Sequence, residues 1–369
     1  MSRIVVVTPW APPSDGIARY SANLAREWLA AGHEVIVLAP PTTHSGEEEL
    51  SGEVNVRRVV TRRTPWAALL DEIRPDHVVV QFAVPALRLA ALGISALLRA
   101  ATDRGIPTTV AYHEASRDVG RLRVLGRWLY RRVAAETRDA VAFVPREADI
   151  LRAVGCHRVR VVPHGTRERE RLDATAVRES YHLTEPFVMS FGYIHPHKSF
   201  ETFIDALALM GEPVTALLAG SVRQRHGLFR LLGRADEKYQ AMLEGRIAAL
   251  PSSVTLRRVG YLPDHDLRAL LQSADVVAIP YRETSQSGVA AEVLANGSAI
   301  VAAEVPGLTD MLHDAAIYVT PGDAAGLAAA MNVLRHSAAQ RETSCERALW
   351  WANEESFART AASLIANAN

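Results

Sequence analysis

Short apolar runs alternate along the first half of the chain with segments whose apolar residues recur at helical spacing. The runs are Ile4–Val7, Val35–Leu38, His77–Val80, Thr108–Ala111, Ala140–Val144 and Val159–Val162. The amphipathic segment 18–31, for example, separates the first run from the second. Apolar runs of strand length that alternate with helical segments are typical of a parallel, doubly wound sheet with helices on both faces.

The same alternation restarts after a polar segment at 166–179. The second set of runs is Val188–Phe191, Val214–Ala219, Val254–Leu256, Val276–Ile279, Ile300–Ala302 and Ile317–Val319, with helical patterns such as 200–210 and 264–272 between them. The chain is therefore predicted to be α/β, with two Rossmann-like domains at 1–168 and 180–348 joined by a hinge. Ligands of such sheets bind beyond the carboxyl ends of the strands, and we expect the domains to face each other across a cleft.

Composition agrees with two domains and argues against several classes of protein. The 369 residues suit two domains, and 41 Lys and Arg balance 41 Asp and Glu, so the whole chain shows no bias towards nucleic acid. The two cysteines form no Cys-x-x-Cys motif, which predicts neither a zinc site nor a disulfide and favours a reduced, cytoplasmic protein. The first apolar run is too short for a signal peptide, and we expect no run as long as a membrane span.

The segment Tyr281–Gly297, which follows a predicted strand, carries the clearest chemical pattern. Ser287 and Gly288 form a turn that leads into an amphipathic helix, so free N–H groups and the helix dipole point at a ligand. Carboxylates stand on both sides, with Glu283 before the turn and Glu292 in the helix. Amides that bind phosphate, placed between carboxylates that bind hydroxyls, suit a nucleotide sugar.

Two further side chains stand just beyond predicted strands. His113 follows the run 108–111, where it would point into the cleft to bind a sugar hydroxyl or act on a proton. The alternative is a structural histidine whose hydrogen bonds are satisfied in the core. Lys198 opens a helix shortly after Gly192 ends a strand, a position that the helix dipole disfavours unless an anion lies between them. This pattern favours a diphosphate site, and the alternative is a surface lysine.

Three weaker candidates lie in turns after strands. Gly16 follows the first strand and is equally consistent with a phosphate loop and with a structural turn. Tyr261 and Leu262 offer backbone groups to a nucleobase edge, or belong to an ordinary strand-to-helix loop. His164 is either a ligand contact or a capping residue, and Gly165 beside it allows the backbone to approach the cleft closely.

One segment in the first half is strongly basic, although the chain as a whole has no net charge. Its arginines are Arg117, Arg121, Arg123, Arg127, Arg131, Arg132 and Arg138, interleaved with Leu122, Leu125, Trp128 and Leu129. A basic helix with an apolar face binds anionic lipid or an anionic acceptor in one interpretation. In the other it is a solvated helix whose apolar side packs on the sheet.

Together these segments resemble the retaining glycosyltransferases of family 4, which have the GT-B fold. The resemblance extends over nearly the whole chain in the order of the family. It rests on the segments PPSDGIARYSANLAREWLAAGHEVIVL, AYHEAS, VVPHGT, FGYIHPHKSFETFIDAL, VGYLPDHDLRALLQSADVVAIPY and SGVAAEVLANGSAIVAAEVPGLTDML.

The resemblance implies roles for individual residues. Lys198 would hold the donor diphosphate, with Gly16 beside it, and the backbone of Gly288 and Val289 would contact phosphate. Glu292 would be the second carboxylate of the family's E-x7-E motif and would bind the ribose hydroxyls. His113 would contact the donor sugar near the reacting centre. The resemblance also implies that a final helix, 349–366, crosses back to the first domain and that Trp350 and Trp351 pack there.

Two departures from the family's pattern concern the predicted site. The first glutamate of the motif would fall at position 284, where this chain has Thr284, and Glu283 is displaced by one residue. The family commonly carries an arginine where this chain has Tyr193, and Arg223 is the candidate replacement as the second cation on the diphosphate.

The predicted reaction moves a sugar from a GDP- or UDP-linked donor to an acceptor hydroxyl with retention of configuration. The acceptor is a glycan, a lipid-linked sugar or a small molecule, and Arg117, Arg121 and Arg127 are assigned to the acceptor or to an anionic membrane surface. No cofactor, metal ion or nucleic acid is expected, and the protein is expected to be cytoplasmic, with or without peripheral contact with the membrane. A sugar-nucleotide epimerase on the same scaffold and a non-catalytic nucleotide-sugar-binding protein are the alternatives.

Overall fold

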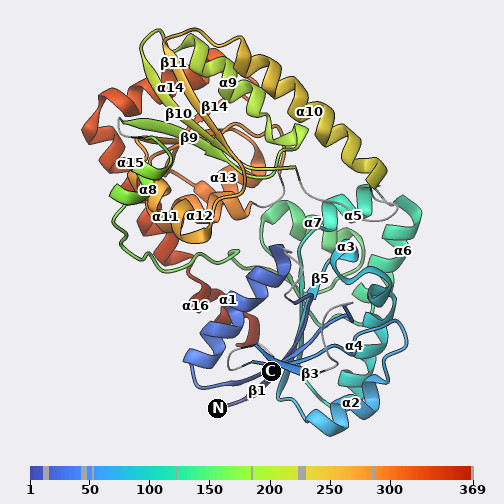
Figure 1. Cartoon of the computed structure of the whole chain (residues 1–369). Helices are drawn as coiled ribbons and strands as arrows, with labels where there is room; N and C mark the ends of the chain where they lie inside the picture. Colours follow the sequence, from blue (N-terminus) through green and yellow to red (C-terminus); the bar gives the residue numbers. More distant parts are fainter. Residues whose placement is uncertain are drawn as a thin grey trace. The chain divides into compact units, whose positions relative to one another are not determined.

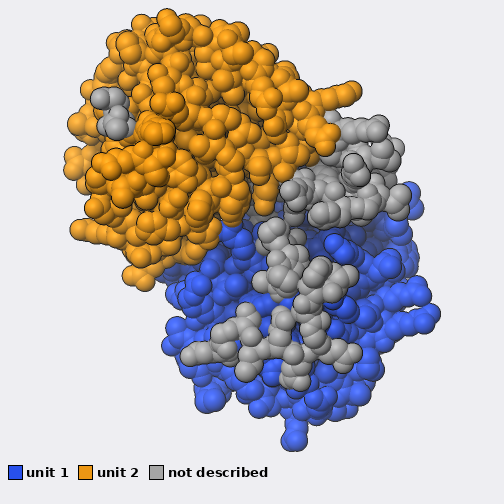
Figure 2. Space-filling model, viewed as in Figure 1, with its two compact units in different colours: residues 1–165, 355–369 blue, residues 166–354 orange. Residues whose placement is uncertain are grey.

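The structure is a computed structural model that describes residues 1–10, 16–42, 48–51, 54–121, 123–183, 186–222, 230–284 and 287–366. It divides into two compact units, shown in Figures 1 and 2. Unit 1 comprises Met1–Gly165 and Glu355–Asn369, and unit 2 comprises Thr166–Glu354. Each unit is an α/β sheet covered by helices.

Unit 1 has, within the described residues, an eight-stranded sheet in the order β3-β4-β2-β1-β5-β6-β7-β8. Its strands are β1 (Arg3–Val7), β2 (Glu34–Leu38), β3 (Glu48–Ser51), β4 (Val54–Arg57), β5 (His77–Phe82), β6 (Thr108–Tyr112), β7 (Asp139–Ala142) and β8 (Val159–Val161). Neighbouring strands are parallel except for the β3–β4 pair. Its helices are α1 (Gly16–Ala30), α2 (Trp66–Ile73), α3 (Val84–Leu87), the 3-10 helix η1 (Arg88–Gly93), α4 (Ile94–Asp103), α5 (Ala115–Arg121), α6 (Arg123–Ala134), α7 (Pro145–Ala153) and α16 (Phe357–Ile365).

Unit 2 has, in the part of it that the structure describes, a six-stranded parallel sheet in the order β11-β10-β9-β12-β13-β14. Its strands are β9 (Phe187–Phe191), β10 (Val214–Ala219), β11 (Val254–Val259), β12 (Val276–Ile279), β13 (Ile300–Ala303) and β14 (Ala316–Val319). Its helices are α8 (Thr175–Ser180), the 3-10 helix η2 (Pro196–Lys198), α9 (Phe200–Leu209), α10 (Arg230–Ala248), α11 (Asp264–Ser273), α12 (Gly288–Asn296), α13 (Pro306–Leu312), α14 (Ala324–His336) and α15 (Ala338–Glu354). The strand order reverses between β9 and β12, which makes the carboxyl end of β9 the expected ligand site.

The apolar runs form strands because both faces of each sheet are buried. In unit 1 one face packs against α2, α4 and α6, and the other against α1 and α16, so central strands such as β1 and β5 are buried almost throughout. Each predicted strand is present, which confirms the two doubly wound sheets. The sequence analysis missed β3 and β4, because β4 reads Val-Asn-Val-Arg and buries only alternate residues.

The end of the chain differs from the single helix predicted at 349–366. Two helices are present instead. α15 ends at Glu354 and α16 begins at Phe357, with Glu355 and Ser356 between them. α15 packs on α12, and within unit 2 Trp351 stacks on His313 at 3.6 Å between ring centroids. α16 returns to unit 1, where the Ala361 carbonyl accepts a hydrogen bond from Trp28 Nε1 at 2.9 Å. Trp351 therefore packs on unit 2, and the return to unit 1 begins at Glu355.

One helical stretch, Val84–Asp103, is long and apolar enough to cross a membrane, with 20 residues and a mean hydropathy of 1.5. The expectation that no run has this character is therefore wrong. The stretch combines α3, η1 and α4, and half of it is buried in the protein. Ile94, Leu97 and Leu98 lie in the core of unit 1, so packing against the sheet accounts for much of its apolar character.

Candidate functional site

The candidate site lies in unit 2, where the ends of β9 and β10 approach each other. A Cβ atom on Gly220 would lie 1.9 Å from the carbonyl oxygen of Gly192, and both glycines have positive φ angles, +153° and +137°. A Cβ atom on Gly192 would lie 3.5 Å from Cγ2 of Val289 and 3.6 Å from the hydroxyl of Tyr281. The end of β9 therefore lies directly against the start of α12, and the two glycines let the backbones after β9 and β10 come into contact.

Lys198 lies at the same place, as the last residue of η2. Its Nζ atom is 3.6 Å from the centre of the Tyr281 ring, and the side chain is half-buried. Burial lowers the pKa of Lys198 from 10.5 to about 7. Within the described residues no carboxylate lies within ion-pair distance of Nζ, and the face of the Tyr281 ring gives it a cation–π contact.

A buried polar network fixes the turn that carries Lys198. Ser199 has a left-handed backbone, with φ at +51°, and its hydroxyl bonds Thr202 Oγ1 at 2.9 Å. Arg282 Nη2 donates to the buried Glu201 carboxylate at 2.7 Å, and Tyr239 donates to the same carboxylate. The Arg282 amide also donates to the carbonyl of His197, which ties η2 to the segment after β12. The sequence analysis missed this network, because its members are separated along the chain.

The start of α12 has the geometry of an anion-binding site. Ser287 caps the helix, and its hydroxyl accepts a hydrogen bond from the Ala290 amide at 3.3 Å. Gly288 and Val289 are the first helical residues, whose N–H groups have no acceptor inside the helix. The Val289 side chain and the Tyr281 ring that Lys198 lies over both border Gly192, so the predicted phosphate contacts and the predicted cation belong to one region of unit 2.

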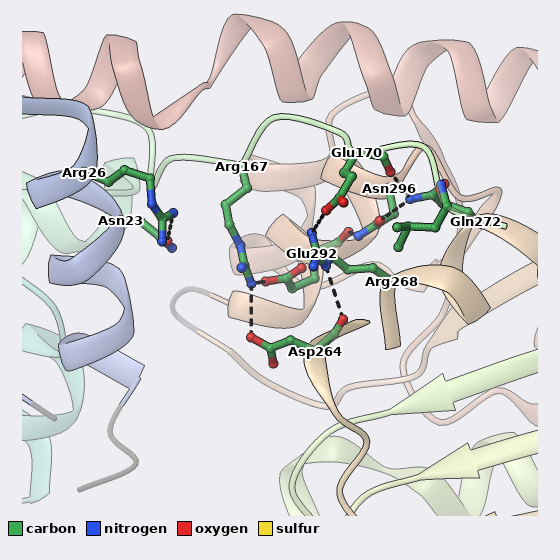
Figure 3. A network of polar contacts seen from close by, with 10 residues as sticks. Asn23, Arg26, Arg167, Glu170, Asp264, Arg268, Gln272, Glu292 and Asn296 are labelled. Carbon is green, nitrogen blue, oxygen red and sulfur yellow. Dashed lines mark hydrogen bonds and ion pairs between the residues drawn. The ribbon is translucent and has the colours of Figure 1, made fainter. Parts of the chain in front are cut away.

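Glu292, one turn further along α12, is paired with a residue that the sequence analysis did not identify. Arg167 Nη2 lies 2.5 Å from Glu292 Oε1 and 3.9 Å from Asp264 Oδ2 (Figure 3). Asn296 Nδ2 donates to the Glu292 carbonyl at 2.8 Å and Asn296 Oδ1 accepts from Gln272 at 3.0 Å. The carboxylate predicted to bind ribose is thus half-buried and already bonded to an arginine.

Arg167 belongs to the polar segment that the sequence analysis interprets as a hinge. The structure ties this segment to unit 2, because Glu170 accepts from Arg268 at 2.8 Å and its carbonyl accepts from Gln272 at 2.7 Å (Figure 3). The Leu172 amide donates to Gln272 as well, at 3.3 Å. The run of alternating charges at 166–170 was visible in the sequence, but its partners on α11 and α12 were not.

The remaining predicted residues of unit 2 have varied surroundings. Glu283 is exposed, and no ion pair involves it among the residues described. Tyr261 is 61% exposed, whereas the Leu262 side chain is buried, which leaves only its backbone for a ligand. Tyr193 is exposed, and Arg223 lies outside the described residues.

His113 of unit 1 is buried in an aromatic cluster. Its Nε2 lies 2.7 Å from Gln81 Oε1, and its ring meets Tyr20 edge-on at 5.0 Å and Phe143 at 4.8 Å. Burial lowers the pKa of His113 well below 6.5, and the pKa of His164, which lies against Tyr20, to about 4. Both imidazoles are therefore neutral at pH 7.

The glycines and arginines predicted as site residues in unit 1 are not gathered into a common site by the described contacts. Gly16 begins α1 and is exposed. A Cβ atom on Gly165 would lie 2.7 Å from Cδ1 of Phe357, so this glycine gives room to α16 rather than to a ligand. Arg127 is exposed on α6, and the side chains of Arg117 and Arg121 lie outside the described part of the chain. Among the described residues no group of three or more His, Cys, Asp or Glu could hold a metal ion.

Two doubly wound α/β units in one chain are the architecture of the GT-B fold of glycosyltransferases. Solved structures agree: sucrose-phosphate synthase from Thermosynechococcus elongatus has a TM-score of 0.76 at 19% identity, covering 98% of this chain and 97% of that one. HepE from Anabaena in complex with UDP has a TM-score of 0.72 at 16% identity, covering 99% and 98%.

The family models identify the chain more narrowly. Residues 14–170 match Glycosyltransferase Family 4, and residues 185–336 match Glycosyl transferases group 1. The chain therefore belongs to the glycosyltransferase family whose two domains these models describe. It is also 25% identical over 345 residues, 85% of this chain and 82% of the relative, to the GDP-mannose-dependent alpha-(1-6)-phosphatidylinositol dimannoside mannosyltransferase of Mycobacterium tuberculosis.

Proposed function

We propose that this glycosyltransferase is a retaining enzyme that binds the diphosphate of a nucleotide-sugar donor at Lys198 and the start of α12. The observation that carries the proposal is the position of Lys198. Its half-buried ammonium group has no carboxylate partner among the described residues and lies over the Tyr281 ring. The Tyr281 hydroxyl and the Val289 side chain both border Gly192, and α12 begins with the amides of Gly288 and Val289. A cation and two amides gathered in this way favour an anion with several oxygens.

The same groups support the proposed chemistry. Breaking the bond between sugar and diphosphate builds negative charge on the leaving phosphate and positive charge on the sugar ring. Lys198 and the amides of Gly288 and Val289 would stabilise the first charge without a metal ion. Glu292 would hold the ribose hydroxyls while Arg167 orients its carboxylate. Glu283 is proposed as the second carboxylate, displaced by one residue from the family's position.

The donor is proposed to be GDP- or UDP-linked, because a relative is named for GDP-mannose and a structural neighbour binds UDP. Mannose is the sugar favoured by the mycobacterial relative. The acceptor is proposed to be a hydroxyl of a glycan, a lipid-linked sugar or a small molecule, and the reaction is placed in the cytoplasm.

The test is a panel of GDP-, UDP- and ADP-sugars with EDTA present, in which release of the nucleoside diphosphate and the anomeric configuration of the product are measured. We expect one class of donor to be consumed with retention. Lys198→Ala is expected to lower turnover at least about 100-fold while the protein remains folded. Lys238→Ala, at the exposed lysine of α10, is the matched control. Full turnover in Lys198→Ala would contradict the proposal, and interconversion of sugar nucleotides without transfer would identify an epimerase.

A further inference from the structure

Helix α6 carries large apolar side chains on two sides, and only one side is covered. On the inner side Leu129, Tyr130 and Val133 are buried in the core of unit 1, beside Phe82. Figure 1 shows α6 along the outside of unit 1, and α4 is one of the elements it packs against.

The outer side exposes three large apolar side chains close together. Val124 is 84% exposed, Leu125 62% and Trp128 46%. Because residues three and four apart on a helix are neighbours, these side chains share one patch. Packing on the sheet, one of the two interpretations of this segment, explains Leu129 but leaves Leu125 and Trp128 without a role. Single exposed apolar residues are ordinary, whereas a group on one helix indicates an interaction surface.

The cations of α6 border this apolar patch. Arg127 and Arg131 are exposed, and the guanidinium of Arg132 lies 5.6 Å from the centre of the Trp128 ring. Arg132 Nε also donates to Ser95 Oγ of α4 at 3.0 Å, which holds that cation at the edge of the patch. The sequence of α6 contains no acidic residue.

The acidic groups on either side of α6 do not neutralise the patch. Asp118 is buried, and its Oδ2 accepts from the Tyr130 hydroxyl at 3.0 Å and from the Val84 amide at 2.9 Å. Glu136 pairs with Arg99 of α4 at 2.5 Å. Among the described residues these two acidic groups leave the outer side of α6 cationic and apolar, in a chain with no net charge.

We propose that the outer face of α6, made of Val124, Leu125, Arg127, Trp128 and Arg131, docks on the surface of an anionic lipid bilayer. The aliphatic side chains would enter the interface between head groups and acyl chains, and the indole ring would lie at head-group level. The arginines would meet the lipid phosphates. A bilayer is the one partner that offers anionic groups above an apolar layer in this order.

Charge argues against the nearest competing partner, a second copy of the chain. Two α6 faces meeting about a two-fold axis would bring the Arg127 and Arg131 side chains of both copies together, and like charges across an interface are costly. The surface is built from unit 1 residues alone, so the inference does not depend on which donor or sugar unit 2 takes.

Vesicle co-sedimentation of the full chain tests the proposal. The vesicles are pure phosphatidylcholine or phosphatidylcholine with about one third phosphatidylglycerol, at low and at high salt. We expect the protein to pellet with the anionic vesicles at low salt and much less with the neutral ones. Arg127→Gln with Arg131→Gln should lower the partition coefficient by on the order of fivefold for each arginine. Leu125→Ser with Trp128→Ser should lower it even at high salt, where the electrostatic attraction is screened.

The matched control is Arg62→Gln with Arg63→Gln, which removes the same charge from another exposed place in unit 1. It should pellet like the unsubstituted protein, and all three double variants should keep its thermal unfolding midpoint, because the altered side chains are exposed. The proposal is overturned if the unsubstituted protein stays in solution with anionic vesicles. It is also overturned if the α6 variants pellet like the control, or if the face instead forms a dimer in size-exclusion chromatography that these substitutions dissociate.

Discussion

The charge of Lys198 is expected to govern the affinity for nucleoside diphosphates above neutral pH. Burial lowers its pKa from 10.5 to about 7, which at about 1.4 kcal/mol per pKa unit disfavours the ammonium form by roughly 5 kcal/mol. A diphosphate against Nζ supplies the missing counter-charge and raises the pKa again. Nucleotide binding should therefore take up about half a proton at pH 7 and nearly one proton at pH 9.

The affinity for the nucleotide should fall about tenfold for each pH unit above 7, or roughly 100-fold by pH 9. Isothermal titration calorimetry in two buffers of different ionisation enthalpy measures both the affinity and the proton uptake. Lys198→Arg keeps a cation at every pH and should bind with little pH dependence over this range. Lys238→Met should keep the slope of the unsubstituted protein, because Lys238 is exposed.

The folding stability of the ligand-free protein should show the opposite pH dependence to the nucleotide affinity and rise with pH. Between about pH 7 and 10.5 the unfolded chain holds a proton on Lys198 that the folded chain has lost, so this residue makes stability rise with pH. Lys198 and Lys238 are the only lysines in the chain, so isotope-labelled lysine gives two side-chain signals whose titration yields each pKa. A Lys198 signal that titrates near 10.5 in the free protein, or a flat affinity from pH 7 to pH 9, would refute the reasoning.

Three further predictions concern other parts of the structure. Glu292→Gln should weaken binding of UDP or GDP on the order of tenfold or more but leave binding of inorganic pyrophosphate unchanged, since this carboxylate is proposed to hold ribose; equal losses in calorimetry would exclude that role. Gly220→Ala should cost about 3 kcal/mol or more in urea unfolding, because its Cβ would lie 1.9 Å from the Gly192 carbonyl oxygen. Gly211→Ala, with φ at +74° and open space around it, should cost only about 1 kcal/mol, and similar costs for the two would contradict the steric argument. Burial lowers the pKa of His77 from 6.5 to about 4, so the folded state binds fewer protons than the unfolded chain in that window and loses up to about 3 kcal/mol as pH falls from 6.5 to 4; His77→Leu should lessen that slope without abolishing it, because the buried His113 and His164 act in the same direction, and an unchanged slope in urea unfolding would argue against it.

The strands and part of the site could be predicted from the sequence because they depend on local pattern. Runs such as 276–279 are continuous where both sheet faces are buried. Lys198 follows β9 and Glu292 lies on the helix that follows β12, at the edge of the sheet where ligands of such sheets bind. The position of Glu292 could also be predicted from the family's E-x7-E motif.

The partners of these residues could not be predicted, because they depend on which distant segments meet. Nothing in the spacing links Arg167 to Glu292 or Tyr281 to Lys198. The apolar pattern of α6 did not predict which side of the helix is buried. Both Leu125 and Leu129 fit helical spacing, but only Leu129 is buried. Such pairings are fixed by tertiary packing rather than by propensity.

The return of α16 to unit 1 has a consequence for how the protein is made. Unit 2 is one uninterrupted stretch of chain, whereas unit 1 needs Glu355–Asn369 to cover a face of its sheet. Until α16 arrives, the indole N–H of Trp28 and the hydroxyl of Thr109 lack the acceptors that Ala361 and Leu364 provide. Unit 1, which begins the sequence, is therefore completed only after the whole of unit 2 has been synthesised, which reverses the usual order in which domains fold from the N-terminus.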